Sequence, residues 1–293
     1  MFTPVDPIPP AYHFQVEERY TVKSECYSIN NEELKTKLYE LYSKTDQSSS
    51  YQLTISLLLS SQLGDVELYT EVLKKIYTNL GLTFKTTPEE FQSIVAGWEG
   101  QVSFNIWLLG RVLVSADNMQ DKHTGSRVAS LMHSSLTTIE KVDPFSTWAW
   151  GYLAAHYASD KKEYPYYRIQ MLESTEALKK QAIEKEKDNV QWALRMDILA
   201  AGNSGDRETY NKLLQEFKEW TGKETISKAI LTIPKEDFTA WALAIVRIAA
   251  AKVKDIDTYQ ELALTLEQAI KDSPSEQDKL LAEVNNLLSA CFI

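Results

Sequence analysis

A recurring aromatic pair is the feature of this sequence that most constrains its fold. The pair has the form Phe-x-x-Trp and occurs as Phe104/Trp107, Phe145/Trp148 and Phe238/Trp241. Trp192 holds the matching place in a fourth segment, where Asn189 stands in place of the phenylalanine, and successive tryptophans are 41, 44 and 49 residues apart. Intervals of this size are typical of a repeat of two helices joined by loops of variable length.

The repeat extends beyond the aromatic residues. Residues 192–210 align with residues 241–259 at a constant offset of 49, and residues 51–69 align with the first of these segments at an offset of 141. We therefore expect five or six imperfect helix pairs. Each pair would bury a large aromatic residue against its neighbour.

The spacing of apolar residues predicts an all-α fold class. From Glu32 onward, apolar residues recur at intervals of three and four, and glycine and proline number only 10 and 9. This is the pattern of amphipathic helices. We expect about 13 to 14 antiparallel helices, near residues 31–45, 50–62, 65–80, 88–98, 102–117, 124–140, 144–158, 161–187, 189–203, 206–221, 223–231, 235–252, 256–272 and 275–290.

These helices are predicted to stack as an α-solenoid. Neither helix of a pair can bury its apolar face alone, so contact between successive pairs must supply the core. A closed α/α barrel, in which the pairs curl into a ring, would use the same sequence pattern. It remains the alternative architecture.

Several helix boundaries carry capping residues. Thr87-Pro88-Glu89-Glu90 combines a hydroxyl cap with a proline at the first helical position and a glutamate at the third, which together satisfy the free amides of a helix start. Gly64-Asp65 and Gly205-Asp206 each lie between two periodic apolar segments. In such a place glycine ends one helix in a left-handed conformation and aspartate caps the next. Both dipeptides predict tight turns inside helical hairpins.

The hairpins around these turns resemble those of the tetratricopeptide repeat superfamily. The resemblance is carried by Leu63-Gly64-Asp65 followed by Tyr69, and by Ser204-Gly205-Asp206 followed by Tyr210. The repeats of this chain are longer than that family's period of about 34 residues. At the level of the fold, the resemblance implies a scaffold or adaptor role.

The first residues differ in composition from the rest of the chain. Residues 1–20 hold four prolines, which fix the backbone angle φ and favour extended geometry. We interpret residues 1–20 as a proline-rich extended arm and residues 21–293 as a single helical-repeat domain. Within the arm, Pro9-Pro10-Ala11-Tyr12 resembles the Pro-Pro-x-Tyr ligands of WW domains. The alternative is that Tyr12 packs the arm onto the first helices.

Charge and apolar content argue against several classes of partner. A formal net charge of -10 and a pI near 5.1 disfavour nucleic acid, which requires clustered Lys and Arg. No stretch reaches the roughly 18 apolar residues of a membrane-spanning helix, so we expect no membrane insertion. Cys26 and Cys291 are too few for a disulfide framework, which favours a reducing, cytoplasmic location.

No sequence motif indicates catalysis, a cofactor or a metal site. The chain lacks His-Glu-x-x-His, a paired Cys-x-x-Cys, a phosphate-binding glycine-rich loop and Gly-x-Ser-x-Gly. We therefore predict no catalytic, cofactor-binding or metal-ligating residue. The alternative is a helical-barrel hydrolase or lyase in which two of the 41 acidic residues act as general acid and base.

The leading functional hypothesis is a non-enzymatic scaffold or adaptor whose helical-repeat surface binds another protein. The candidate partner contacts are Pro9, Pro10, Tyr12, Tyr164, Tyr166 and Tyr167. The three later tyrosines surround Pro165, and so many bulky residues cannot all face inward. A secreted bacterial effector that acts in a host cytoplasm is a further hypothesis, because residues 275–289 and the apolar end Cys291-Phe292-Ile293 resemble the tails of some type IV secretion substrates.

Overall fold

A computed structural model describes residues 31–136, 143–182, 187–232 and 238–293 of the chain. The predicted arm at residues 1–20, with the candidate contacts Pro9, Pro10 and Tyr12, lies outside these residues. Within the described part every regular element is an α-helix. None of the described helices is both long enough and apolar enough to cross a lipid bilayer.

Fourteen helices make up the described part of the chain, and each overlaps one predicted range. They are α1 (Glu32–Ser43), α2 (Ser50–Gln62), α3 (Val66–Asn79), α4 (Pro88–Ala96), α5 (Val102–Asn118), α6 (Lys122–Leu136), α7 (Pro144–His156), α8 (Glu163–Gln181), α9 (Lys187–Asn203), α10 (Arg207–Thr221), α11 (Ile226–Ile230), α12 (Thr239–Lys252), α13 (Ile256–Asp272) and α14 (Glu276–Ala290). The predicted all-α class is therefore confirmed.

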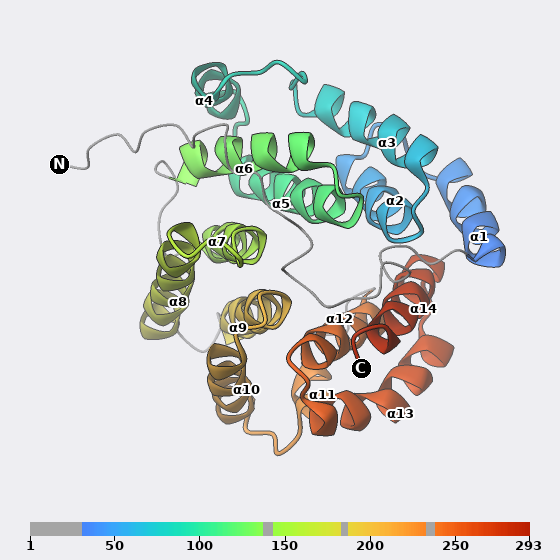
Figure 1. Cartoon of the computed structure of the whole chain (residues 1–293), viewed down its shortest axis with the longest axis vertical. Helices are drawn as coiled ribbons and strands as arrows, with labels where there is room; N and C mark the ends of the chain where they lie inside the picture. Colours follow the sequence, from blue (N-terminus) through green and yellow to red (C-terminus); the bar gives the residue numbers. More distant parts are fainter. Residues whose placement is uncertain (1–30, 137–142, 183–186, 233–237) are drawn as a thin grey trace.

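The helices form two concentric layers (Figure 1). The inner layer runs α2, α5, α7, α9, α12 and α14, and each of these helices packs against the next. The outer layer holds α3, α6, α8, α10 and α13, each of which packs on the inner helix of its own pair. The core lies between the two layers and between neighbouring pairs, as expected for stacked repeats.

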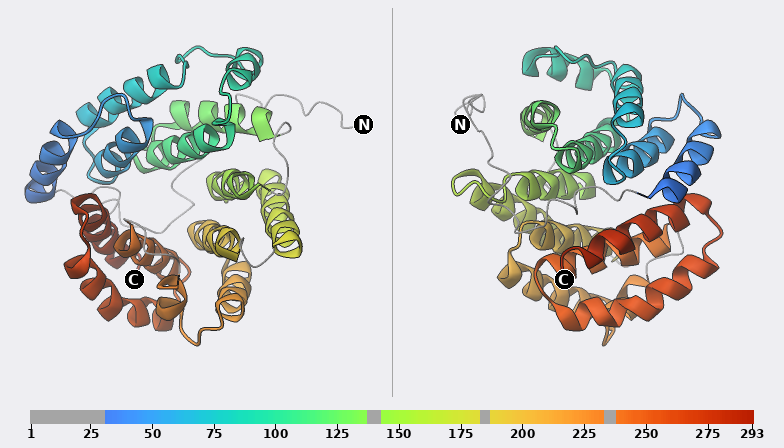
Figure 2. Two further views of the ribbon diagram at one scale, coloured as in Figure 1. Left: turned by 180° about the vertical axis from the view of Figure 1, so that it is seen from behind. Right: turned by 45° about the vertical axis from the view of Figure 1, so that its right-hand side comes forward.

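The two ends of the stack meet. Helix α14 packs against both α1 and α2, and Figures 1 and 2 show the last helices beside the first. Gln62 Nε2 of α2 donates a 3.0 Å hydrogen bond to Asn285 Oδ1 of α14 across this contact. The helix pairs are therefore stacked as predicted. Because the ends of the stack meet, the pairs form a ring, which is the arrangement of the alternative architecture, a closed α/α barrel.

The four repeat tryptophans lie on inner helices, as the repeat predicts. Trp107 is 9% exposed, whereas Trp148, Trp192 and Trp241 are half-buried. The ring centroids of Trp107 and Trp148 are 5.9 Å apart, and those of Trp148 and Trp192 are 5.7 Å apart. Tyr51 of α2 stacks on Trp107 at 5.9 Å, so one row of aromatic rings links four successive pairs.

The two predicted Gly-Asp turns are confirmed. Gly64 and Gly205 have φ angles of 66° and 71°, the left-handed conformation that glycine adopts without strain. Asp65 and Asp206 are the N-cap residues of α3 and α10. The predicted capping box at Thr87 is also present, since Thr87 and Glu90 bond each other's backbone amides.

The capping aspartates also join one helix pair to the next. In three places a tyrosine hydroxyl of an outer helix donates to the aspartate at the start of the following outer helix. The bonds are Tyr69 to Asp121 at 3.2 Å, Tyr164 to Asp206 at 2.5 Å and Tyr210 to Asp255 at 3.3 Å. Each aspartate thus satisfies a backbone amide of its own helix and a hydroxyl of its neighbour.

The Tyr–Asp bonds between pairs predict a measurable contribution to stability. Tyr210→Phe removes the hydroxyl that reaches Asp255, and a hydrogen bond to a charged group contributes roughly 1.5–3 kcal/mol. We expect its melting temperature to fall by about 3 °C or more in calorimetry. Tyr259→Phe is the matched control, because Tyr259 holds the same place on α13 and no described residue accepts a hydrogen bond from its hydroxyl. Equal melting temperatures for the two variants would contradict the role assigned to the bond.

Helices α9 and α12 approach so closely that a methyl group does not fit between them. A Cβ atom on Gly202 would lie 2.4 Å from Cβ and 2.8 Å from Cα of Ala249. A Cβ atom on Gly151 of α7 would instead meet Ala200 Cβ and Met171 Sδ at 3.6 Å, an ordinary contact.

We therefore expect opposite effects from two glycine-to-alanine substitutions. Gly202→Ala forces the two backbones apart and should lower the free energy of unfolding by about 1–3 kcal/mol. Gly151→Ala should be neutral or should raise it by about 0.4–1 kcal/mol, because alanine restricts the unfolded chain. Urea unfolding of both variants tests this, and a Gly202→Ala variant as stable as wild type would refute the close approach.

Candidate functional site

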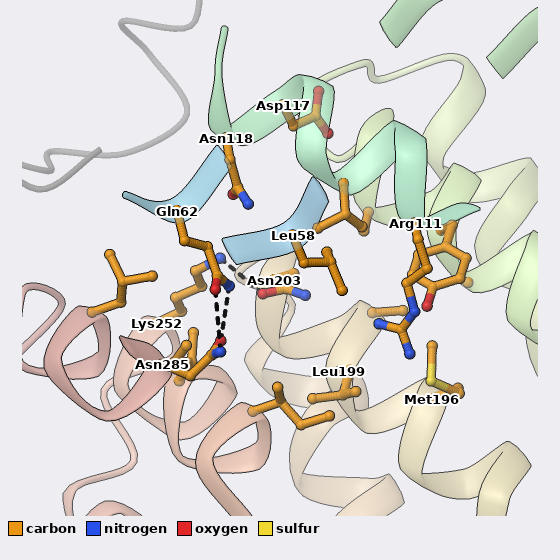
Figure 3. A pocket seen from close by; sticks show the side chains of 18 of the residues that line it. Leu58, Gln62, Arg111, Asp117, Asn118, Met196, Leu199, Asn203, Lys252 and Asn285 are labelled. Atoms are coloured by element: carbon orange, nitrogen blue, oxygen red, sulfur yellow. Dashed lines mark hydrogen bonds between the residues drawn. The ribbon is translucent and has the colours of Figure 1, made fainter. Parts of the chain in front are cut away.

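A cavity of about 220 Å³ lies inside the ring, towards the C-terminal ends of the inner helices. All six inner helices contribute to its walls. Figure 3 labels ten of the residues that line it, which are Leu58, Gln62, Arg111, Asp117, Asn118, Met196, Leu199, Asn203, Lys252 and Asn285. Every inner helix contributes at least one residue to this cavity.

The wall of the cavity follows the register of the repeat. Residues that stand 4, 7 and 11 positions after a repeat tryptophan share its helical face, because the α-helix has 3.6 residues per turn. The first layer is formed by Arg111, Tyr152, Met196 and Ile245. The second layer is formed by Val114, Ala155, Leu199 and Ile248. The third layer, at the rim, is formed by Asn118, Asn203 and Lys252.

Arg111 is the most deeply placed charge in the wall. The residue is only 8% exposed, and aromatic rings surround its guanidinium carbon, with centroids at 4.8 Å for Trp107, 4.7 Å for Trp241 and 5.5 Å for Tyr152. Gly110 makes room for the Tyr152 ring, since a Cβ atom there would lie 2.2 Å from Cδ2 of that ring. Burial lowers the pKa of the Arg111 guanidinium, but arginine stays protonated in proteins.

No hydrogen bond or ion pair joins Arg111 to any described residue, and its buried Nε atom has no acceptor there. Figure 3 shows its guanidinium directed toward the space between Leu58, Met196 and Leu199. A buried cation is normally paired with a carboxylate, because leaving it unpaired costs desolvation free energy. Among the described residues, Arg111 is compensated only by the faces of aromatic rings.

The rim of the cavity is polar. Gln62, Asn118, Asn203 and Lys252 are the last residues of their four inner helices. Lys252 Nζ donates a 2.8 Å hydrogen bond to Asn203 Oδ1, drawn in Figure 3 together with the Gln62–Asn285 bonds. A lysine at this place also offsets the partial negative charge of the helix C-termini.

The only carboxylate among the described lining residues is already engaged. Asp117 Oδ1 and Oδ2 lie 3.1 and 3.3 Å from His156 Nδ1, and His156 is buried at the end of α7. General acid–base chemistry of the glycosidase type uses two carboxyl groups that face one ligand. The described wall offers one such group, and its oxygens point to a histidine.

The predicted tyrosine contacts lie away from this cavity, on the outer helix α8. Tyr167 is fully buried and stacks on Tyr157, with ring centroids 5.2 Å apart. Tyr164 is half-buried and bonds Asp206, while Tyr166 is 44% exposed. Of these three predicted contacts only Tyr166 is exposed, because Tyr167 packs on Tyr157 and the hydroxyl of Tyr164 bonds Asp206.

Sequence reasoning did not select any of the cavity residues. A usable pattern was present, since Arg111 is the single charged residue in the apolar stretch 106–114 and stands four residues after Trp107. Nothing in the sequence says whether such an arginine faces a cavity or reaches solvent along its aliphatic stem. Among the described residues, no group of three or more His, Cys, Asp and Glu side chains is placed to hold a metal ion.

Comparison with known proteins identified no relative of this chain. No protein-family model matches it, and neither the curated proteins nor the solved structures searched contain a significant match. What the cavity binds must therefore be inferred from the residues that line it.

Asp197 is one of the ionisable residues that are buried outside the cavity. It lies on α9 facing α8, has no exposed surface and accepts a 2.5 Å hydrogen bond from Thr175 Oγ1. Burial raises the pKa of the Asp197 carboxyl well above its usual value, and the Thr175 bond opposes only part of that effect. The carboxyl is therefore easier to bury protonated than ionised.

This raised pKa predicts a pH-dependent stability. Because the folded-state pKa exceeds the unfolded value of about 3.9, the stabilising contribution of Asp197 is complete below that value and is lost as pH rises through the folded pKa. Asp197→Asn carries no charge, so its stability relative to wild type should increase from pH 4 to pH 8. Urea unfolding at both values tests this, with the exposed Asp272→Asn as control. A stability difference between Asp197→Asn and wild type that does not change with pH would contradict it.

Proposed function

We propose that this protein is a non-enzymatic binding module whose ligand site is the cavity inside the helical ring. The observation that carries the proposal is the composition of the wall, in which every inner helix supplies apolar side chains around a few polar groups. That combination is typical of sites for small organic molecules. The repeat sequence predicted a non-enzymatic protein that binds another protein. The present proposal keeps the non-enzymatic binding role but assigns it a small organic molecule as ligand.

The size of the cavity supports a small ligand over a peptide. At about 30 Å³ per water molecule, a volume of 220 Å³ corresponds to about seven waters, or a ligand of roughly seven to ten non-hydrogen atoms. Because the two ends of the stack meet, the concave face encloses this space and does not form a long open groove. A partner protein would therefore have to bind elsewhere on the ring, and Tyr166 is the exposed candidate among the predicted contacts.

The engaged state of Asp117 supports binding without catalysis. Its two oxygens contact His156, and no other carboxylate lines the described wall. A hydrolase or lyase of the predicted acidic type would need a second carboxyl group on the opposite side of the ligand.

Fragment binding to a blocked and an unblocked cavity tests the proposal. Ala155 lies in the middle layer of the wall and is only partly buried, so Ala155→Phe fills the cavity at small cost in packing. Ala158→Phe is the matched control, because Ala158 is equally half-buried three residues later and does not line the cavity. Both variants are first compared with wild type by circular dichroism and thermal unfolding.

A library of neutral, anionic and cationic fragments of seven to ten non-hydrogen atoms is then screened by saturation-transfer NMR. We expect a subset to bind wild type and Ala158→Phe, to lose binding in Ala155→Phe, and to remain chemically unchanged over the experiment. Binding that survives Ala155→Phe would place the site elsewhere. Conversion of a bound fragment would favour the enzymatic alternative.

A further inference from the structure

We infer that the cavity binds a small organic carboxylate and that Arg111 receives its anionic group. This inference rests on the proposed binding function and adds the chemical class of the ligand. It depends on the placement of one buried cation, on the buried donors beside it and on the order of the three layers in the wall.

The first step is the missing partner of Arg111. Its guanidinium is buried at the inner end of the cavity, contacts three aromatic rings and has no carboxylate or hydrogen-bond acceptor in the described part of the chain. Cation–π contacts compensate a buried charge less well than an anion does. A ligand carboxylate would supply the acceptor, and the planar guanidinium binds a carboxylate through two parallel hydrogen bonds.

The second step is an excess of donors around that cation. Trp107 Nε1 and Tyr152 Oη are buried without a hydrogen-bond partner among the described residues, and both rings contact the Arg111 guanidinium. An indole N–H can only donate, and a guanidinium has no acceptor. Tyr152 lines the cavity and Trp107 does not, but among the described residues the surroundings of the Arg111 guanidinium are rich in donors and poor in acceptors, which favours a ligand group that accepts.

The third step is the order of the layers. Between Arg111 and the rim lies an apolar layer that includes Val114, Leu199 and Ile248. Arg111 and Asn118 are seven residues apart on α5, which corresponds to about 10.5 Å of helix rise. The matching ligand has a carboxylate at one end and a short apolar body that ends near the amides of the rim.

The charges of the wall favour a monoanion. The only other cation in the described wall is Lys252, which is at the rim and bonds Asn203. Arg195 is a second buried cation whose charge also acts on Tyr152, but it does not line the cavity. Arg111 is therefore the single cation at the inner end of the described wall, which matches one negative charge better than the two of a phosphate dianion. The helix C-termini at the rim disfavour an anion there, so the carboxylate should bind at the inner end.

Calorimetric titration of the full-length protein tests the inference. The probes are butanoate, hexanoate and octanoate, with 1-hexanol and hexylamine as uncharged and cationic counterparts and inorganic phosphate as a second anion. Arg111→Met removes the charge while keeping an unbranched side chain. Arg207→Met is the matched control, because Arg207 is exposed at the start of α10, away from the cavity.

We expect hexanoate to bind wild type about tenfold or more tightly than 1-hexanol, and to bind more tightly than hexylamine or phosphate. Affinity should rise about fourfold for each methylene added until the chain reaches the rim. Arg111→Met should abolish the advantage of hexanoate over 1-hexanol, and Arg207→Met should leave it unchanged. Ala155→Phe should weaken all of these probes.

The outcomes separate this inference from the proposed function. If fragments or 1-hexanol bind in the cavity but hexanoate binds no more tightly, the carboxylate inference is wrong and the binding function stands. If no probe or fragment binds, both are wrong. If Arg111→Met does not fold, Arg111→Lys decides, since it keeps the charge but loses the paired hydrogen bonds. Equal hexanoate binding by wild type and Arg111→Lys would then overturn the role of the guanidinium.

Discussion

At three junctions between helix pairs, a carboxylate that serves two helices at once holds one pair to the next. Asp206 accepts a hydrogen bond from the backbone of α10 and others from Tyr164 and Arg168 of α8. Because a capping residue has a set position relative to its own helix, a bond to that residue also sets the register of the neighbouring helix. The alignment of inward-facing residues around the ring depends on that register.

The series of Tyr–Asp bonds is interrupted once, beside the cavity. Gly125 stands four residues after Asp121, where the other hairpins have tyrosine, and a Cβ atom there would lie 3.4 Å from the His156 ring. His156 binds Asp117 at this place. The one carboxylate of the described cavity wall is thus used in joining α5 to α7. Within the part of the chain that the structure describes, Arg111 is left with aromatic neighbours and no acid.

The wall of the cavity could have been located from the sequence only if it had been known which face of each inner helix points into the ring. Arg111, Met196 and Ile245 each stand four residues after a repeat tryptophan, and that spacing places them on one helical face. The face could not be assigned to the ring interior, because an amphipathic helix of a stacked pair packs on several neighbours. An inner helix carries apolar residues both on the face toward the cavity and on the faces that pack against neighbouring helices. Apolar periodicity therefore does not show which of these faces points into the ring.

The amino-acid sequence by itself determined the helices, their caps and their pairing, because these depend on local spacing of apolar and capping residues. It left solenoid and barrel open, since closure depends on a small rotation between successive pairs that accumulates along the chain. Only the tertiary structure decided that α14 meets α2, where Gln62 and Asn285 exchange hydrogen bonds. That closure converts a concave face into a cavity and makes Arg111 a buried cation that faces it.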